Sequence, residues 1–336
     1  MPSRIVANMP RPACISPQLR ICTSLLALCS TMIALASGLS IPGEAASPRP
    51  DAEPSAGLAA GQVLTVSASD SAPGDLFGTS VAMGQDVAVV GAPGADGGTG
   101  AVYVLVRTQS GTPQWTQAAK LKPSSGEPGD AFGASVDIDG DTIVVGAPGE
   151  DRDAENAGGV YVFKRSDRDY GQWSEGRRLR CSAPTPNAGC GSSVAISGPV
   201  LVAGAPGHSS GVGAAYLFDR LGNSDIFLLR KRLRPASQYA TWGFGRAVDV
   251  DGPVAVVRTH LSDDWSWGSW GGTFVFERDA GGISNWGQTQ ELDGSYYHVS
   301  VVQPVAVLGD TIVVGESYEF HDSGMGFVLP NGRVFV

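Results

Sequence analysis

The sequence predicts an all-β protein built from one repeated unit. Glycine and proline are abundant, with 46 and 22 of the 336 residues, a composition that favours many turns and short strands over long helices. A unit of about 55 residues also recurs along the chain. Its start is marked at Phe77, Phe132, Cys190, Phe244 and Tyr297. These two observations predict repeated sheets that bury their apolar faces against one another.

The unit has four segments, and each has the pattern of a short strand. The first contains Phe-Gly, as in 73–81 and 128–136. The second is an apolar run that ends in Gly-Ala-Pro, at 87–93, 142–148 and 200–206. The third begins with glycine and continues with aliphatic and aromatic residues, as in 158–163. The fourth has an aromatic residue six positions before a leucine, as in Trp173 and Leu179.

Each segment meets a physical need of a four-stranded sheet packed on both faces. The second segments are nearly all apolar, which suits strands that neighbouring sheets cover on both sides. Asp139-Gly140 and Asp251-Gly252 fit tight hairpin turns between the first two strands. The proline of Gly-Ala-Pro has no amide hydrogen to donate and ends its strand. Such units packed around an axis form the blades of a β-propeller.

Phe-Gly followed by Gly-Ala-Pro at this spacing resembles the FG-GAP repeat family, which forms the integrin α-chain propeller and occurs in many bacterial exported proteins. The resemblance covers about residues 60–336 and is closest in the first two copies. In the fourth and fifth copies, 254–258 and 311–315, the Gly-Ala-Pro ending is lost. The resemblance implies a β-propeller with a role in adhesion at the cell surface.

We expect five blades within a domain at 61–336. The segment 63–66 precedes the first Phe-Gly as a fourth strand should, and the last copy reaches only its third strand at 332–336. The leading strand would therefore complete the last blade and close the ring, which leaves no open sheet edge. A truncated or assembled seven-bladed ring and a stepped solenoid stay as alternatives.

The N-terminal region has the layout of a secretory signal. Arg4, Arg11 and Arg20 precede an uncharged apolar stretch, 21–41, which small residues follow. We predict a signal peptide and short linker at 1–46, with cleavage after Ala36 or near Ala45, and a flexible linker at 47–60. The expected location is secreted, periplasmic or cell-surface, with no membrane insertion after cleavage; a retained anchor is the alternative.

Cys181 and Cys190 are nine positions apart across a segment rich in proline. In an exported chain such a pair predicts a disulfide, with two buried thiols as the alternative.

The formal net charge is −10. This charge disfavours nucleic acid and anionic membranes as partners, and it favours a basic partner, a neutral glycan or a cation.

Calcium is the metal that the resemblance implies, and no other cofactor is expected. Asp137, Asp139 and Asp141 alternate in a first hairpin, but the glycine falls between the second and third carboxylates and the closing acid is absent. Asp151, Asp153 and Glu155 form a second candidate in the loop after Gly-Ala-Pro. The alternatives are a plain hairpin and a solvated acidic loop.

No motif for a catalytic nucleophile is present, so we expect no enzymatic activity. The four histidines, His208, His260, His298 and His321, lie in different repeats and are expected on the surface or in loops. An enzyme acting on glycans through carboxylates from separate blades remains an alternative.

The best candidate for ligand binding is the loop that holds Asp263, Asp264, Trp265, Trp267 and Trp270. Aromatic rings beside carboxylates suit a sugar or a protein partner. These tryptophans could instead fill space left by the degenerate fourth copy. The sequence therefore favours a module that binds a glycan or protein at the cell surface, with a scaffold that binds no ligand as the alternative.

Overall fold

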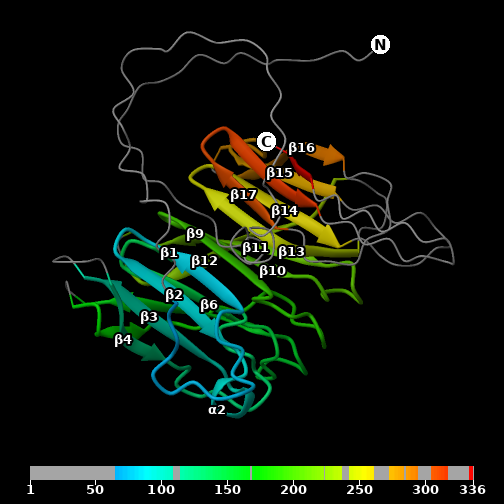
Figure 1. Ribbon diagram of the computed structural model, residues 1–336. Coiled ribbons are helices and arrows are strands. Elements are labelled where there is room, and N and C mark those ends of the chain that lie inside the picture. The colour runs from blue at the N-terminus through cyan, green and yellow to red at the C-terminus, as the bar shows by residue number, and fades with distance from the viewer. Residues whose placement is uncertain are drawn as a thin grey trace, which may run out of the picture.

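The computed structural model describes residues 65–108, 114–166, 169–222, 224–236, 242–260, 272–283, 285–293, 304–316 and 333–335. Within these residues the chain forms five antiparallel β-sheets, which we call blades 1 to 5 in chain order (Figure 1). Blades 1 to 4 have four strands each, and the described part of blade 5 has three. The predicted all-β class and the four-stranded unit are confirmed.

The strands of each blade follow the predicted segments. Blade 1 contains β1 (Ser80–Met83), β2 (Val87–Ala92), β3 (Ala101–Arg107) and β4 (Trp115–Leu121), with a tight turn, α2 (Ala95–Gly98), between β2 and β3 in which Asp96 and Gly97 have positive φ. Blade 2 contains β5 (Ser135–Asp139), β6 (Thr142–Ala147), β7 (Gly159–Arg165) and β8 (Trp173–Glu175). Blade 3 contains β9 (Ser193–Ser197), β10 (Val200–Ala205), β11 (Ala214–Arg220) and β12 (Phe227–Leu233).

Blades 4 and 5 repeat the same order. Blade 4 contains β13 (Trp242–Asp251), β14 (Val254–His260), β15 (Gly272–Arg278) and β16 (Trp286–Asp293). Blade 5 contains β17 (Val305–Leu308), β18 (Thr311–Glu316) and β19 (Arg333–Phe335).

The first strands of successive blades lie beside one another, β1 next to β5, β5 next to β9, β9 next to β13 and β13 next to β17. Figure 1 shows the sheets following one another from cyan at blade 1 to orange at blade 5. This arrangement is consistent with blades of a propeller set around an axis. Every second strand that ends in Gly-Ala-Pro stops at the alanine, as the proline predicts.

Closure of the ring stays a prediction. Residues 61–64 lie outside the described residues, and Thr65 and Val66 are not in a strand. Ala68 packs instead on blade 1, in a cluster with Tyr103 and Phe77. The predicted signal peptide and linkers also lie outside the described residues. Within the described part of the chain, no helix is long and apolar enough to cross a membrane.

The glycine of Gly-Ala-Pro packs against the glycine of Phe-Gly in the next blade. A Cβ added to Gly91 would lie 2.0 Å from the carbonyl oxygen of Gly133. The same contact would be 1.9 Å for Gly146 on Gly191, and 1.9 Å for Gly204. Real Cβ atoms do not approach backbone this closely, so the motif glycines allow neighbouring blades to touch through their main chains.

A serine hydroxyl also joins each pair of neighbouring blades at this contact. Ser80 Oγ donates to the Gly133 carbonyl at 2.7 Å, and Ser135 Oγ donates to the Gly191 carbonyl at 2.7 Å. Ser193 Oγ donates to the Gly245 carbonyl at 2.9 Å. The Phe-Gly carbonyl is therefore hydrogen-bonded as well as closely packed.

The junction between blades 4 and 5 is built differently. Ala247 takes the place of the serine, and Arg258 takes the place of the Gly-Ala-Pro glycine. Arg258 is buried, and its guanidinium donates to the Gly315 carbonyl at 3.2 Å. In the degenerate fourth copy, a long cationic side chain thus contacts the backbone of the next blade.

The phenylalanine of Phe-Gly packs edge-on against the aromatic residue of the third strand in the same blade. The ring centroids of Phe77 and Tyr103 are 5.4 Å apart, and those of Phe132 and Tyr161 are 5.3 Å apart. Edge-to-face pairs at this separation stabilise a core beyond their area alone.

The aromatic residues of the fourth strands face an arginine at the end of the third strand. Arg278 lies over Trp286 and Arg220 over Phe227, at 5.7 and 4.9 Å from the ring centroids. Trp286 is buried completely. These rings are part of the packing between the outer strands.

We predict that Gly91→Ala destabilises the protein strongly, because the new Cβ cannot fit beside the Gly133 carbonyl. The free energy of unfolding should fall by about 1–3 kcal/mol, measured by denaturant titration. Gly84→Ala is the matched control, since a Cβ there meets nothing closer than 3.8 Å. Equal losses in both variants would contradict the proposed role of the glycine contact.

Candidate functional site

Blades 1, 2 and 3 each carry a polar cluster beside the loop that follows Gly-Ala-Pro. Each cluster contains a third-strand tyrosine and the cation that precedes the fourth-segment leucine. We call them the loop centres of blades 1, 2 and 3. The tyrosine and cation pairs are Tyr103 with Lys120, Tyr161 with Arg178, and Tyr216 with Arg232.

In the loop centre of blade 1, two aspartates neutralise two lysines. Lys120 Nζ lies 2.7 Å from Asp70 and 3.3 Å from Asp96, and Lys122 Nζ lies 2.8 Å from Asp96. Lys120 and the hydroxyl of Tyr103 hold the pKa of Asp70 below its usual value. Asp96 bridges two cations that lie two positions apart in sequence.

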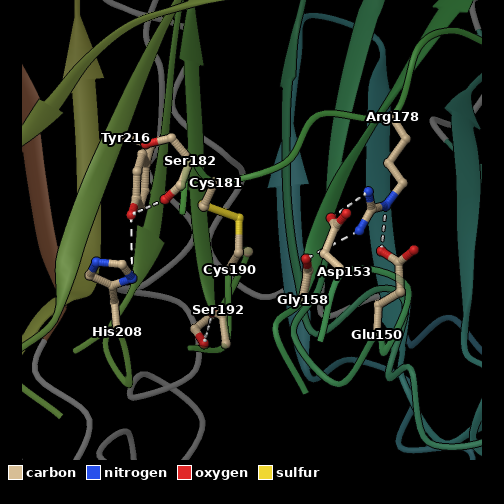
Figure 2. The surroundings of a disulfide bond; sticks show 12 residues. Glu150, Asp153, Gly158, Arg178, Cys181, Ser182, Cys190, Ser192, His208 and Tyr216 are labelled. Carbon is tan, nitrogen blue, oxygen red and sulfur yellow. Dashed lines mark hydrogen bonds and ion pairs between the residues drawn. A yellow bond between two sulfur atoms is a disulfide. The ribbon is translucent and has the colours of Figure 1, made fainter. Parts of the chain in front are cut away.

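Blade 2 repeats this arrangement with different residues. Arg178 lies 3.0 Å and Arg180 lies 3.2 Å from Asp153, so this aspartate again bridges two cations two positions apart. Glu150 is almost fully buried and lies 2.7 Å from Arg178 and 3.1 Å from Arg152. Burial raises the pKa of Glu150, and Arg178 opposes that rise. Arg178 thus pairs with two carboxylates, those of Glu150 and Asp153 (Figure 2).

In the candidate calcium loop of blade 2, acidic side chains already bind other residues of the protein. Asp153 binds the two arginines, and Asp151 accepts a hydrogen bond from the Asn156 amide at 2.6 Å. The carbonyl of Glu155 accepts the Asn187 amide. Among the residues described, no group of three or more histidine, cysteine or acidic side chains could hold a metal ion. Asp151 and Asp153 thus take part in contacts within the protein, and calcium binding at Asp151, Asp153 and Glu155 stays a prediction.

The alternating aspartates of the first hairpin join blades together. Asp137 Oδ2 accepts the Ile196 amide at 2.7 Å, and Asp139 Oδ2 accepts the Gly198 amide at 2.5 Å. Residues two apart in a strand share a face, so both carboxylates point at the same hairpin of blade 3. Asp141 lies apart from these contacts and 3.5 Å from Lys164. We call the Asp137 and Asp139 contacts the hairpin latch.

Blade 4 repeats the hairpin latch toward blade 5. Asp249 Oδ2 accepts the Val307 amide and Asp251 Oδ2 accepts the Gly309 amide, at 2.6 and 2.8 Å. In blade 3 the hydroxyl of Ser197 takes this role and accepts the Gly252 amide at 3.1 Å. The alternating aspartates that resembled a calcium motif therefore act as acceptors between blades.

The loop centre of blade 3 contains a disulfide in place of the usual phenylalanine. Cys190 stands at the Phe-Gly position, and it is bonded to Cys181 with a Cα–Cα distance of 6.0 Å. The predicted disulfide is confirmed. Tyr216 consequently lacks a phenylalanine partner, and His208 packs edge-on against it with ring centroids 5.9 Å apart (Figure 2).

The hydrogen bonds of His208 define its protonation state. Arg232 can only donate, and its Nη1 lies 3.1 Å from His208 Nε2, so Nε2 accepts and the ring is neutral. The Nδ1 hydrogen then faces the Tyr216 oxygen at 3.4 Å, and Tyr216 donates to the Ser182 carbonyl at 3.0 Å. Burial and then the charges of Arg232 and Arg234 lower the pKa of His208.

His208 is buried within its loop. It lies in a loop, as expected, but it is only 3% exposed because it fills the space beside Tyr216. Sequence reasoning gave it no role. An alignment of the repeats would have singled out this position, because His208 follows Gly-Ala-Pro-Gly just as Ala95 and Glu150 do.

The candidate ligand loop follows β14 in the chain. Asp263, Asp264, Trp265, Trp267 and Trp270 all lie at 261–271, outside the described residues. That segment connects β14 to β15 and is the blade 4 counterpart of the loops at 93–100, 148–158 and 206–213.

We predict that His208 makes stability depend on pH. Its folded pKa lies below the value near 6.5 of the unfolded chain. Its contribution is therefore present above about pH 6.5 and is lost as the pH falls through the folded pKa. Tm should fall less steeply for His208→Gln than for the original chain between about pH 7.5 and 5. All other titrating groups are common to both proteins, so parallel curves would exclude this role.

We predict that Asp137→Ala weakens the hairpin latch, because it leaves the Ile196 amide without this acceptor. The free energy of unfolding should fall by about 1–3 kcal/mol. Glu291→Ala, on the exposed face of β16, is the control and should change it by less than about 0.5 kcal/mol. Millimolar calcium should leave Tm of the original chain unchanged. A calcium-dependent rise in Tm that Asp137→Ala abolishes would instead establish a metal site.

Comparison with known proteins identifies the repeat. Residues 61–105 and 115–163 match the family described as FG-GAP repeat. A search of curated proteins finds no match. Among solved structures, one titled "Structure of YjhT" is 14% identical, covers 73% of each chain and has a TM-score of 0.41. The matched segments cover most of blade 1 and most of the first three strands of blade 2, so this chain carries FG-GAP repeats in an all-β fold of propeller-like blades.

Proposed function

We propose that the chain is a non-catalytic binding module that contacts a glycan or a protein through the loops between second and third strands. The observation that carries this proposal is that the residues joining the blades and the loops after Gly-Ala-Pro are separate parts of each blade. The motif glycines, the serines and the first-hairpin aspartates contact the next blade, whereas the loops after Gly-Ala-Pro differ in length and chemistry. Variable loops on a rigid frame are the usual place for recognition.

The arrangement of the blades supports a common surface for these loops. Gly100 bridges to Phe132, Gly158 bridges to Cys190 and Gly213 bridges to Phe244. Each loop therefore ends beside the start of the next blade, at the same edge of its sheet. A ligand could contact more than one loop along that edge.

The loop at 261–271 is the strongest candidate contact, because it has three tryptophans and two aspartates in eleven residues. The packed aromatic position of blade 4 is already filled by Trp286. The three additional indoles are thus beyond what the repeat requires, and aromatic side chains are enriched where proteins bind partners.

Export of the protein is part of this proposal. The Cys181–Cys190 disulfide supports an oxidising compartment, since such bonds are rare in reducing ones. FG-GAP repeats are also typical of extracellular domains. A location outside the cytoplasm would give the loops access to glycans and to proteins of the cell surface.

We predict that replacing Trp265, Trp267 and Trp270 together by alanine reduces retention on a glycan array or partner protein by about tenfold or more, since aromatic anchors dominate such contacts. Tm should change little. Trp286→Ala is the contrasting control and should cost about 3–5 kcal/mol of stability, because that ring is fully buried.

Two outcomes would contradict this function. A collapse of Tm in the triple variant, with no ligand found for the original chain, would indicate that the tryptophans fill the degenerate blade. Turnover of a polysaccharide by the original chain would indicate an enzyme.

A further inference from the structure

The loop centre of blade 3 has the cations of its neighbours without their carboxylates. Arg232 and Arg234 occupy the places of Lys120 and Lys122 in blade 1. Both lysines there are bound by Asp96. Among the described residues, no carboxylate lies within ion-pair distance of Arg232 or Arg234, and Arg234 is exposed.

The loop of blade 3 matches the loop of blade 1 residue by residue. Asp96 and Ser209 both follow Gly-Ala-Pro-Gly by one further residue, and both have φ of 54°. The Gly98 amide donates to the Gly94 carbonyl at 3.1 Å, and the Gly211 amide donates to the Gly207 carbonyl at 3.0 Å. Ser209 therefore stands where a bridging aspartate stands in blade 1.

Other acidic residues do not compensate for this exchange. Neither 181–190 nor 206–213 contains aspartate or glutamate, whereas the corresponding loop of blade 2 at 148–158 contains four. His208 is neutral, because it accepts a hydrogen bond from Arg232. Asp219 is paired with Arg230 and Arg278. In a chain of net charge −10, this is a local excess of positive charge.

We propose that Arg232 and Arg234 form an anion-binding site, in which a carboxylate of the ligand takes the position that Asp96 holds in blade 1. Residues two apart at the end of a strand point to one side, so both guanidinium groups can contact the same carboxylate. Hydrogen bonds between guanidinium and carboxylate are among the strongest in proteins. The inference deepens the proposed binding function and rests on it.

The occupant that the surroundings favour is an acidic oligosaccharide. Trp242 is 51% exposed, and its ring rests on the same loop, because a Cβ on Gly211 would lie 2.7 Å from Trp242 Cζ3. An exposed indole on this loop offers a flat apolar face for a sugar ring, and Arg232, which contacts His208 of the same loop, would bind the carboxylate of that sugar. The site thus fits a uronic acid unit.

The disulfide and His208 hold this site in place. Cys181 lies just after the fourth segment of blade 2, and Cys190 begins blade 3. Their bond restrains the segment between them, which contains Ser182, whose carbonyl accepts the hydrogen bond of Tyr216. His208 and Tyr216 in turn position the Arg232 guanidinium. A pre-positioned cation loses less side-chain freedom when it binds an anion.

The test uses the full chain and an oligosaccharide of galacturonic acid, with a galactose oligosaccharide of equal length as the neutral counterpart. Titration calorimetry should show binding of the acidic sugar that weakens with added salt. The neutral sugar should bind about tenfold or more weakly, since it lacks the carboxylate.

Ser209→Asp is the decisive variant because it rebuilds the bridging carboxylate of blade 1 within blade 3. It removes neither arginine, and aspartate tolerates this left-handed backbone. We predict that it weakens binding of the acidic sugar by about tenfold or more without lowering Tm. Ser174→Asp, on an exposed position of β8, makes the same change of net charge and should leave binding unchanged.

Three results would overturn the inference. Equal affinity for the acidic and neutral sugars, or full binding by Ser209→Asp, would exclude the anion site. The proposed binding function would still be decided separately by the triple tryptophan variant. Preferential binding of a polyglutamate peptide, lost in Ser209→Asp, would replace the acidic sugar by an acidic protein.

Discussion

The structure depends on the contact between the backbones of neighbouring blades at two motif glycines. Gly146 and Gly191 approach so closely that neither could carry a side chain without a shift of main chain. The contact also gives the Gly191 carbonyl a donor, Ser135, which is not part of its own blade. Because the blades are held through main-chain atoms, the chemistry of the outer strands and loops can change while the spacing of the sheets is kept. Where the glycine itself is lost, as at Arg258, the junction needs a new donor.

Because this glycine contact keeps the spacing of the blades, the loop centres of blades 1, 2 and 3 can have different residues. In blade 1 a phenylalanine packs on Tyr103 and two aspartates neutralise the neighbouring lysines. In blade 2 a buried glutamate joins the same frame and requires arginine partners, because an unpaired buried charge would be costly. In blade 3 a disulfide and a neutral histidine replace the ring and the acids. The frame tolerates all three, since none of them lies in the glycine contact.

The sequence predicted the strands well because their signals are local and repeated. Glycine, proline and apolar runs recur at fixed positions, and the disulfide followed from two cysteines in a short segment. The roles of the aspartates could not be predicted in this way. Asp137 looks like a metal ligand in sequence, yet its acceptor role depends on Ile196, which is 59 positions away in the next blade. The candidate loop at 261–271 was found from composition alone.

The loop centres show how comparison within one chain can assign function where a single cluster would not. Two cations beside a loop are common on protein surfaces, and alone they would carry little weight. Their meaning comes from the two neighbouring blades, in which Asp96 and Asp153 each bridge a pair of cations at the corresponding place. Blade 3 shares the loop backbone of blade 1, including the left-handed residue at 209, but has serine where blade 1 has the bridging aspartate. The missing charge is thus the property that a ligand of this site would have to supply.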